Sequence, residues 1–280
     1  MRVLFVAGEV APFSETTPTS QVLRTLPEAL QEHKEVEPRI LMPRYGVVSE
    51  RRNRLHEVIR LSGAEIEAGS AKDTLKVKVA SIPGIRLQVY FMDSVHFFKR
   101  KGLHADRRTG ADFADNPARA LFFARAAFST VENLGWRPDV VHAAGWISAF
   151  VPHVLHTELG ENELFAGVRT VFTPDGPDGY VHEVTEAEVQ ELGLPADMAG
   201  QTMRQIGLST ANAAAYATPD APADGEPDGP QLGDDPEALA DIAAELYASL
   251  DPALAALAAS HRAAFLQESP GQGPDARGRL

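Results

Sequence analysis

The sequence predicts an α/β protein built on a single doubly wound, mostly parallel sheet. Its first apolar run, residues 3–7, has no polar alternation, which is typical of a strand buried on both faces. Segments with helical apolar spacing alternate with such runs, and this order favours parallel strands joined by right-handed crossovers. The composition, 44% hydrophobic and 23% charged over 280 residues, is that of a globular chain long enough to bury a sizeable core.

The first strand, helix and strand are predicted within residues 3–42. After the strand at 3–7 and a loop, apolar residues recur at helical spacing over residues 20–30, which indicates an amphipathic helix. Residues 39–42 then supply a second buried strand. Between residues 74 and 92, apolar and polar residues alternate in two runs separated by Pro83-Gly84, and this pattern predicts an added β-hairpin with one face in water.

The other half of the sheet is predicted after a long helix. Asn116 followed by Pro117 indicates its start, and Gly135 its end. Short buried strands follow at 140–143 and 170–173, with a helix at 146–159 between them. A capping box of Thr185 and Glu188 starts a short helix, then residues 203–214 are predicted to be helical and 215–218 extended.

The composition changes sharply after residue 218. Residues 1–218 are therefore assigned to one domain, 219–236 to an acidic linker rich in proline and glycine, 237–267 to a helical tail and 268–280 to a disordered end. The linker has too little apolar mass to offset the entropy of ordering it. Apolar tail residues are expected to cover a surface that the domain leaves open: Leu239, Ile242, Ala243, Leu246 and Leu250.

Charge and cysteine content exclude several classes of function. The chain has 39 acidic and 26 basic residues, a net charge of −13, which disfavours binding to nucleic acid or to an anionic membrane. It has no cysteine, so disulfides and thiolate chemistry are excluded. No apolar stretch reaches the length of a membrane-spanning helix, and no signal peptide is recognised, so a cytoplasmic protein is expected.

Several loops between the predicted elements follow one known order. They are EVAPF at 9–13, LMPRYG at 41–46, VYFMD at 89–93, DNPARALFFARAA at 115–127, GWRPDVVHA at 135–143 and TVFT at 170–173. Together they resemble the N-terminal half of bacterial glycogen synthases and plant starch synthases, glycosyltransferase family five. The resemblance spans residues 1–218 and implies that the sheet is one Rossmann-like domain, the N-terminal half of a GT-B fold.

The resemblance also implies a reaction. In the family, a glucan acceptor is held largely by the first domain and ADP-glucose largely by a second, and glucose is transferred to the non-reducing end of an α-1,4-glucan with retention of configuration. The stretch after Thr218 is too short for that second domain. We therefore expect this chain to lack a complete donor site.

The loop after EVAPF departs from the family pattern. The family has Lys-Thr-Gly-Gly-Leu there, whose lysine and glycine backbone meet the donor diphosphate, whereas this chain reads Glu15-Thr16-Thr17-Pro18. A carboxylate at the place of the lysine repels phosphate, and such a contact is worth roughly 1 to 4 kcal/mol at about 4 Å. Pro18 has no N–H to donate, and Thr17 places a Cβ where close approach requires glycine.

Two further donor-side motifs differ. The family's His-Asp-Trp-His is here Ala144-Gly145-Trp146-Ile147, so the histidine that touches the donor sugar in the family is missing. The family's Ile-His-Asn after the TVFT-like strand is here Pro174-Asp175-Gly176. Since three donor-side loops have changed together, the sequence disfavours a bound sugar nucleotide.

Residues that match the family pattern are the candidates for a cleft or ligand-binding site: Tyr45, Asp115, Asn116, Arg119, His142 and Trp146. Asp115 aligns with an acidic residue of the family's catalytic cleft, and His142 with a strand-end histidine. Each also has a structural interpretation. Helix capping is favoured for Asp115 and Asn116, a satisfied core position is the equal alternative for His142, and packing is favoured for Trp146.

Three other patterns in the sequence are weaker evidence for a functional site. A cluster of arginines, namely Arg44, Arg51, Arg52, Arg54 and Arg60, suits a phosphate or a partner's carboxylates, but a solvated surface is favoured. His153 and His156 share a helix face without a third ligand, so no metal is expected. Asp175-Gly176 and Asp178-Gly179 are interpreted as turns.

The sequence thus predicts a glycogen or starch synthase-like protein that is inactive alone and needs no cofactor. It would bind an α-glucan, a small ligand or a protein partner in the cleft. The alternative is an active glucosyltransferase completed by another chain or by self-association. A scaffold without a small ligand is a third, weaker possibility.

Overall fold

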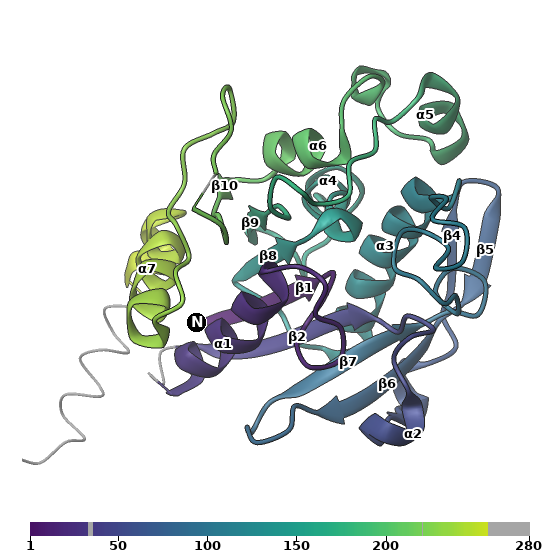
Figure 1. Ribbon diagram of the computed structural model, residues 1–280. Coiled ribbons are helices and arrows are strands. Elements are labelled where there is room, and N and C mark those ends of the chain that lie inside the picture. The colour runs from purple at the N-terminus through teal and green to yellow at the C-terminus, as the bar shows by residue number, and fades with distance from the viewer. Residues whose placement is uncertain (33–35, 220, 257–280) are drawn as a thin grey trace, which may run out of the picture.

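The computed structural model of the protein describes residues 1–32, 36–219 and 221–256. Its centre is an eight-stranded sheet in the order β10-β9-β8-β1-β2-β7-β6-β3 (Figure 1). The strands are β1 (Arg2–Ala7), β2 (Glu37–Pro43), β3 (His56–Glu57), β6 (Lys76–Ser81), β7 (Gln88–Asp93), β8 (Val140–Ala144), β9 (Arg169–Thr173) and β10 (Ala213–Ala214). The predicted α/β sheet is confirmed.

The parallel part of the sheet is doubly wound. From β1 the chain moves outward through β2 to β7, then crosses back to β8 on the other side of β1 and moves outward through β9 to β10, with every neighbouring pair parallel. The strand order therefore reverses between β1 and β8. In open α/β sheets the crevice at the carboxyl ends of the strands beside such a reversal is where ligands bind.

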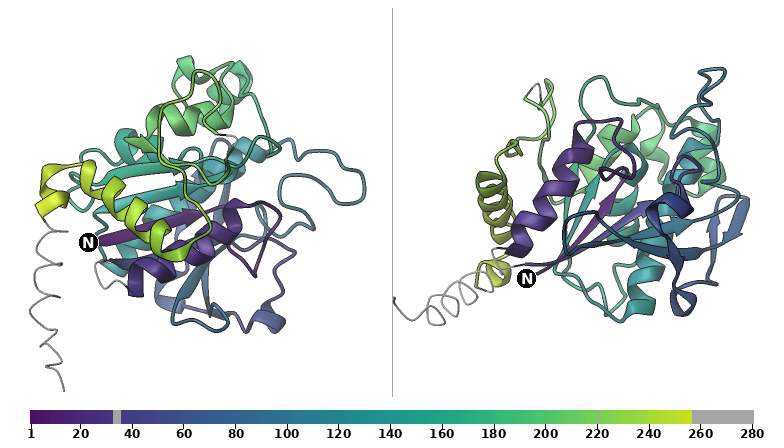
Figure 2. Two further views of the ribbon diagram at one scale, coloured as in Figure 1. Left: turned by 60° about the vertical axis from the view of Figure 1, so that its left-hand side comes forward. Right: turned by 60° about the horizontal axis from the view of Figure 1, so that its bottom comes forward.

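The helices pack on both faces of the sheet. They are α1 (Thr19–Glu32), α2 (Glu50–Asn53), α3 (Asn116–Leu134), α4 (Val151–His153), α5 (Glu186–Leu192), α6 (Met203–Thr210) and α7 (Pro236–Ser249). Helices α1 and α7 lie side by side on one face, and α3, α4 and α6 cover the other (Figures 1 and 2). No helix in the described part of the chain combines the length and apolarity needed to span a bilayer.

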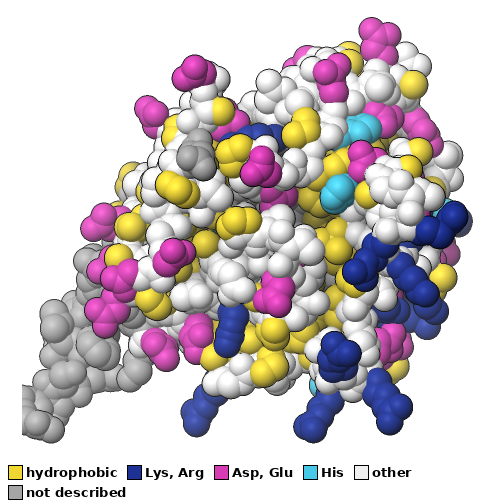
Figure 3. Space-filling model, in the orientation of Figure 1, with side chains coloured by type: hydrophobic (Ala, Val, Ile, Leu, Met, Phe, Trp, Pro, Cys, Tyr) yellow, Lys and Arg dark blue, Asp and Glu magenta, His cyan; other side chains and the backbone are white. Residues whose placement is uncertain are grey.

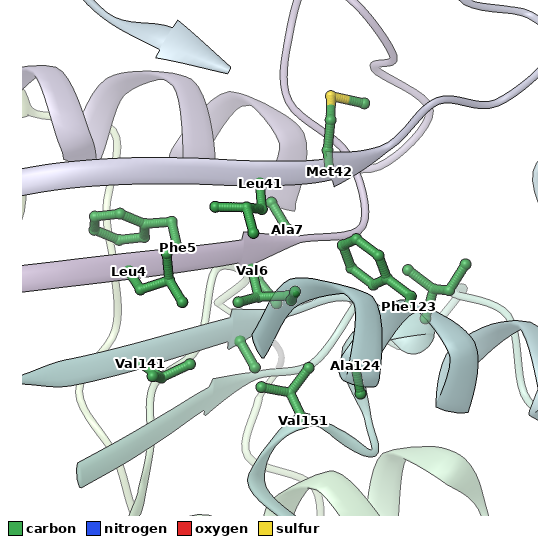
Figure 4. Packing of buried hydrophobic residues seen from close by; sticks show 14 of the residues in the cluster. Leu4, Phe5, Val6, Ala7, Leu41, Met42, Phe123, Ala124, Val141 and Val151 are labelled. Atoms are coloured by element: carbon green, nitrogen blue, oxygen red, sulfur yellow. The ribbon is translucent and has the colours of Figure 1, made fainter. Parts of the chain in front are cut away.

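The core explains why the apolar runs lack alternation. Residues 3–7 of β1 are fully buried because α1 covers one face of the strand and α3 lies over the other. Figure 4 shows side chains of β1 together with Phe123 and Ala124 of α3 and Val151 of α4. Phe123, Ala124 and Val151 are all fully buried. Helix α3 thus follows the predicted apolar stripe and ends, as predicted, at Gly135 in a left-handed conformation with φ 61°.

The predicted hairpin is confirmed. Strands β6 and β7 pair antiparallel, from Lys76 opposite Asp93 to Ser81 opposite Gln88, and extend the parallel sheet at one edge. A second, two-stranded sheet of β4 (Glu65–Ala68) and β5 (Ala71–Thr74) was not predicted from the sequence.

Two predicted helices have different bounds. The helix expected at 146–159 is divided into the 3-10 turn η2 (Trp146–Ser148), α4 and the π-helical turn η3 (Val154–Glu158). Helix α6 ends at Thr210, because the chain must extend again to form β10 beside β9. Further 3-10 turns are η1 (Ile59–Leu61) and η4 (Ala196–Met198). The capping box of Thr185 and Glu188 is confirmed at the start of α5.

The tail packs on the domain as expected. Leu239 and Ala243 of α7 are buried, and Ile242, Leu246 and Leu250 pack against the core. The predicted linker also makes contacts: Tyr216 N–H donates to Pro230 O over 2.9 Å, and Leu232 is buried. The domain boundaries at 218 and 236 stay a prediction. Residues 257–267 of the tail and the predicted disordered end lie outside the described residues.

Candidate functional site

Four strand-end loops meet at the carboxyl edge of the parallel strands. Glu9 follows β1, Tyr45 follows β2, Trp146 follows β8 and Asp175 follows β9. The loop starts are tied together by backbone hydrogen bonds, from Gly8 N–H to Ala144 O at 2.8 Å and from Gly145 N–H to Thr173 O at 3.0 Å. Because these strands are neighbours in the sheet, the loops converge on the crevice where the strand order reverses.

Glu9 organises the loop that departs from the family pattern. Its Oε1 accepts hydrogen bonds from the Ser14 hydroxyl and from the backbone N–H of Thr16, the latter at 3.1 Å. Its Oε2 accepts from the hydroxyls of Thr16 at 2.8 Å and Thr17 at 3.1 Å. Glu9 is buried. The loop's donors are therefore directed at a carboxylate of the protein and not outward to a ligand.

The side chains of Glu15 and Pro18 add no donor for phosphate. Glu15 is exposed and accepts a hydrogen bond of 3.3 Å from the side chain of Gln21. Pro18 is exposed as well, and it has no N–H. Residues 12–16 line one side of a 670 Å³ cavity, and residues 102–107 with Gly110 line much of the other side. Thr16, Thr17 and Pro18 also border a cavity of 420 Å³.

Asp175 places a second carboxylate at the crevice. Its Oδ2 accepts a hydrogen bond of 2.9 Å from the backbone N–H of Trp146, the first residue of η2. Burial raises the pKa of Asp175 to about 6, although that hydrogen bond opposes the shift, and the negative charge of Glu9 raises it further. The carboxylate lies against Gly145, where an added Cβ would stand 3.3 Å from Oδ1.

An apolar cavity of 290 Å³ opens beside Asp175. Trp146 and Tyr180 line it, with ring centroids 5.0 Å apart and planes at 69°. Arg204 and Glu226 close another side, joined by hydrogen bonds of 2.5 and 2.8 Å. The volume is at the small end of the range for small-molecule sites, about 300 to 1,000 Å³.

Aromatic and histidine rings extend this wall. The ring of Tyr180 is stacked with that of His104, with centroids 4.6 Å apart, and with that of His182, with centroids 6.3 Å apart. Histidine and hydrophobic side chains gather in the upper right of the face in Figure 3, whereas Lys and Arg side chains gather at its lower right. The crevice region thus combines aromatic surface with carboxylates.

The side chain of Asp115 does not cap the helix, although capping was its favoured interpretation. Asp115 is the N-cap residue of α3, but its side chain makes no capping hydrogen bond. Its two oxygens instead accept hydrogen bonds of 2.5 Å from the guanidinium of Arg100. Burial alone would raise the pKa of Asp115, but the hydrogen bonds and charge of Arg100 outweigh it and lower that pKa below its usual value.

Asn116 and Arg119 form a buried polar cluster beneath the crevice. Asn116 is the first residue of α3 and not its cap, which corrects the predicted start by one position. Its side-chain amide donates to Tyr180 Oη at 2.8 Å and to His104 O at 2.9 Å, and its Oδ1 accepts from Arg119 at 2.6 Å. Arg119 also donates to Phe97 O, and its guanidinium lies 5.6 Å from the ring of Trp146.

Tyr45 joins this cluster from the loop after β2. Tyr45 and Arg119 are both fully buried, and no described residue hydrogen-bonds to Tyr45 Oη or to Arg119 Nη2. Burial lowers the pKa of Arg119 to about 10 and raises that of Tyr45 well above its usual value. The structure therefore brings Tyr45, Asn116, Arg119 and Trp146 together.

His142 does not belong to the cleft, which corrects its place among the candidates. It is fully buried, with Nδ1 2.7 Å from the hydroxyl of Tyr247 in α7 and Nε2 2.8 Å from that of Thr173. Burial lowers its pKa to about 3, so the ring is neutral near neutral pH. With both ring nitrogens engaged, it is a core residue that ties α7 to the sheet.

The remaining sequence clusters have structural roles. Arg44 is buried and pairs with Asp93 at 3.1 Å and Glu50 at 2.9 Å, whereas the other arginines of that cluster are exposed, as expected for a solvated surface. His153 and His156 hydrogen-bond to threonine hydroxyls. Within the described ranges no group of three or more potential ligand side chains is placed to hold a metal ion.

Sequence reasoning missed five residues of the crevice: Glu9, Asp175, Tyr180, Arg204 and Glu226. Asp175 was interpreted as a turn residue, although its place directly after a buried strand was a usable signal. Tyr180 and Arg204 gave no local signal, because the loop 174–180 and helix α6 meet only in the folded chain. Glu226 lies in the segment predicted as a linker.

Comparison with known proteins places this geometry in a family. Residues 2–204 match the family described as the starch synthase catalytic domain. The glycogen synthase of Chlorobium luteolum is 36% identical over 203 residues, which is 72% of this chain and 41% of that protein. That of Pelodictyon phaeoclathratiforme is 38% identical over 172 residues, 61% of this chain and 35% of that protein. The chain thus spans less than half the length of these relatives.

The fold agrees with a solved relative. The catalytic domain of starch synthase IV from Arabidopsis thaliana, bound to ADP and acarbose, matches 78% of this chain with a TM-score of 0.60 and 21% identity, over 45% of its own length. The architecture is that of the N-terminal domain of a GT-B fold. From the extent of the family match and the identity to glycogen synthases, the chain belongs to the family of the starch synthase catalytic domain and corresponds to its N-terminal part.

Proposed function

We propose that this domain is a non-catalytic homologue of the glycogen and starch synthases that binds a glucan or another small carbohydrate at the crevice and does not use a sugar nucleotide. The observation that carries the proposal is the arrangement around Glu9. Where the family loop meets a diphosphate, this loop directs the N–H of Thr16 and the hydroxyls of Ser14, Thr16 and Thr17 to a buried carboxylate of its own.

Electrostatics support the same conclusion. Glu9, Glu15 and Asp175 put three acidic groups at the edge where a nucleotide diphosphate would have to approach. Among the cations near them, the guanidinium of Arg204 is engaged by Glu226 and that of Arg119 is fully buried, while the exposed Arg107 lines the cavity beside Glu15. A contact between like charges costs roughly 1 to 4 kcal/mol at about 4 Å, so these carboxylates disfavour a diphosphate placed beside them.

The aromatic wall supports a carbohydrate ligand. Trp146 and Tyr180 offer apolar ring surface to the cavity, while Asp175, Glu226 and Arg204 offer hydrogen-bonding groups. Small-molecule sites have this composition, an apolar lining with a few polar groups that fix orientation. The named relatives are glycogen synthases, and the solved one holds acarbose as well as ADP, which fits a saccharide at this edge of the fold.

The experiment is a thermal-shift panel of malto-oligosaccharides, ADP-glucose, UDP-glucose and ADP. A shift with malto-oligosaccharides that Trp146→Leu abolishes, and no shift with the nucleotides, is the expected result. Phe165→Leu is a matched control, because Phe165 is buried against Phe128 away from the crevice. A shift with ADP-glucose and none with the saccharides would overturn the proposal.

Catalytic activity is tested separately. Incubation of the protein with ADP-[14C]glucose and glycogen should give no incorporation above a blank without protein. Clear incorporation, alone or after adding a second chain that supplies a donor domain, would favour an active glucosyltransferase instead.

A further inference from the structure

The carboxylate of Asp175 has one oxygen without a protein partner. Oδ2 accepts from Trp146 N–H, but none of the described residues donates a hydrogen bond to Oδ1 or forms an ion pair with the carboxylate. The carboxylate of Asp175 lies against Gly145. Because glycine has no side chain, the carboxylate can approach closely: an added Cβ there would stand only 3.3 Å from Oδ1. The partly buried carboxylate is thus held in place through Oδ2, and Oδ1 is left to accept a hydrogen bond from a ligand.

The nearby cation does not neutralise Asp175. Arg204 donates one hydrogen bond to the backbone carbonyl of Asp175, and its other contacts are with both oxygens of Glu226. Arg204 and Glu226 therefore balance each other, and Asp175 contributes a net negative charge to the cavity. Glu9, which acts on Asp175 electrostatically, adds to the negative potential.

Aromatic rings face the same cavity. Trp146 is 8% exposed, and together with Tyr180 it forms an edge-to-face pair that lines the space beside Asp175. An ammonium group gains from the face of a tryptophan or tyrosine as well as from a carboxylate. A sugar ring, in turn, presents apolar C–H groups to such aromatic surface.

Building on the proposed function, we propose that the ring seated in this cavity belongs to an amino sugar, with its protonated amine on Asp175 and its apolar face on Trp146 and Tyr180. The cavity of 290 Å³ suits one ring, and further sugar units would continue into the neighbouring 420 Å³ cavity, which shares Gly176, Pro177 and Gly179 with it. The specificity follows from residues of this chain that replace a family motif, since Asp175 stands where the family has histidine.

The test compares three probes of similar size by titration calorimetry at about pH 7: glucosamine, glucose and N-acetylglucosamine. Glucosamine should bind about tenfold more tightly than either neutral sugar, the effect of one charge-assisted contact. Asp175→Asn should remove that preference, so that glucosamine binds no more tightly than glucose. Asp178→Asn is the matched control, because Asp178 is exposed on the same loop and does not line this cavity.

A second readout needs no variant. The preference for glucosamine should fall at about pH 5, because Asp175, with a pKa of about 6, is then mostly protonated while the amine stays charged. Glu9, Arg204 and His104 are the charged or titratable groups that act on Asp175. Circular dichroism at both pH values establishes that the protein remains folded.

The outcomes separate the two proposals. Equal affinity for glucosamine and glucose, or a preference that Asp178→Asn removes as fully as Asp175→Asn, overturns the amino-sugar assignment and leaves carbohydrate binding standing. No binding of any probe or of malto-oligosaccharides overturns both.

Discussion

The backbone N–H of Trp146 donates a hydrogen bond of 2.9 Å to Oδ2 of Asp175 across the end of the β8 and β9 strands. The N–H at the start of a helical turn beside a strand-order reversal is where such folds place a ligand's anionic group. Here a carboxylate of the protein occupies that position. At Glu9, too, a carboxylate of the protein accepts hydrogen bonds from loop donors, and on the function proposed above both arrangements disfavour a bound anion.

Changing the charges of Glu15 and Asp175 should favour the binding of a nucleotide. The double variant Glu15→Lys with Asp175→Asn is expected to bind ADP at least about tenfold more tightly than the unmodified protein, since each altered contact is worth roughly 1 to 4 kcal/mol. Titration calorimetry with ADP measures it. Glu161→Lys, an exposed change on the loop after η3, alters the charge of the protein without touching the crevice and should leave the affinity unchanged.

Replacing Glu9 should loosen its loop. Glu9→Gln turns one acceptor into a donor that faces hydroxyl and N–H donors, so we expect the free energy of unfolding to fall by about 1 to 3 kcal/mol. Urea denaturation gives the value. Glu15→Gln, on the exposed side of the same loop, should stay within about 0.5 kcal/mol. Equal effects of the two changes would mean that Glu9 does not hold the loop.

His142 should make the protein sensitive to acid. Its pKa is about 3 in the folded protein against 6.5 in the unfolded chain, so the unfolded state binds the proton first. The contribution of His142 to the free energy of unfolding is therefore full above about pH 6.5. It is lost as the pH falls toward 3, by at most about 1.4 kcal/mol per pH unit. His142→Gln, which keeps a donor and an acceptor, should flatten this part of the curve of unfolding free energy against pH. An unchanged slope would contradict the assignment.

The tail should stabilise the domain. Removing residues 219–280 uncovers the α1 surface under α7 and leaves Nδ1 of His142 without Tyr247, so the melting temperature should fall by at least about 5 °C. Differential scanning calorimetry measures it. Tyr247→Phe isolates the hydrogen bond and should cost about 1 to 3 kcal/mol. An unchanged melting curve after truncation would show that α7 contributes nothing.

The fold could be predicted where burial decides it. Residues 3–7 read as a doubly buried strand because α1 and α3 exclude water from both of its faces, and the alternation at 75–91 followed from a hairpin at the edge of the sheet. Helix ends were less certain. Residues 203–214 read as one helix, yet pairing of Ala213 with Val171 ends α6 early, and pairing between strands distant in sequence leaves no local signal.

The candidate site was predicted only in part, for a similar reason. The loop at 15–18 could be singled out because its residue types contradict phosphate binding at their own positions. Asp175, Tyr180 and Arg204 acquire their roles from neighbours brought close by folding: Trp146, Asn116 and Glu226 respectively. His142 was placed in the cleft by its strand-end position, but α7, far along the chain, covers it.

The most direct test of the account is a crystal structure of the protein soaked in ADP-glucose at millimolar concentration. We predict no diphosphate at the loop 14–18, with Glu9 still accepting its hydrogen bonds from Thr16 and Thr17 and Asp175 still on the N–H of Trp146. A diphosphate bound beside Glu15, with the loop's donors turned from Glu9 toward it, would contradict the account.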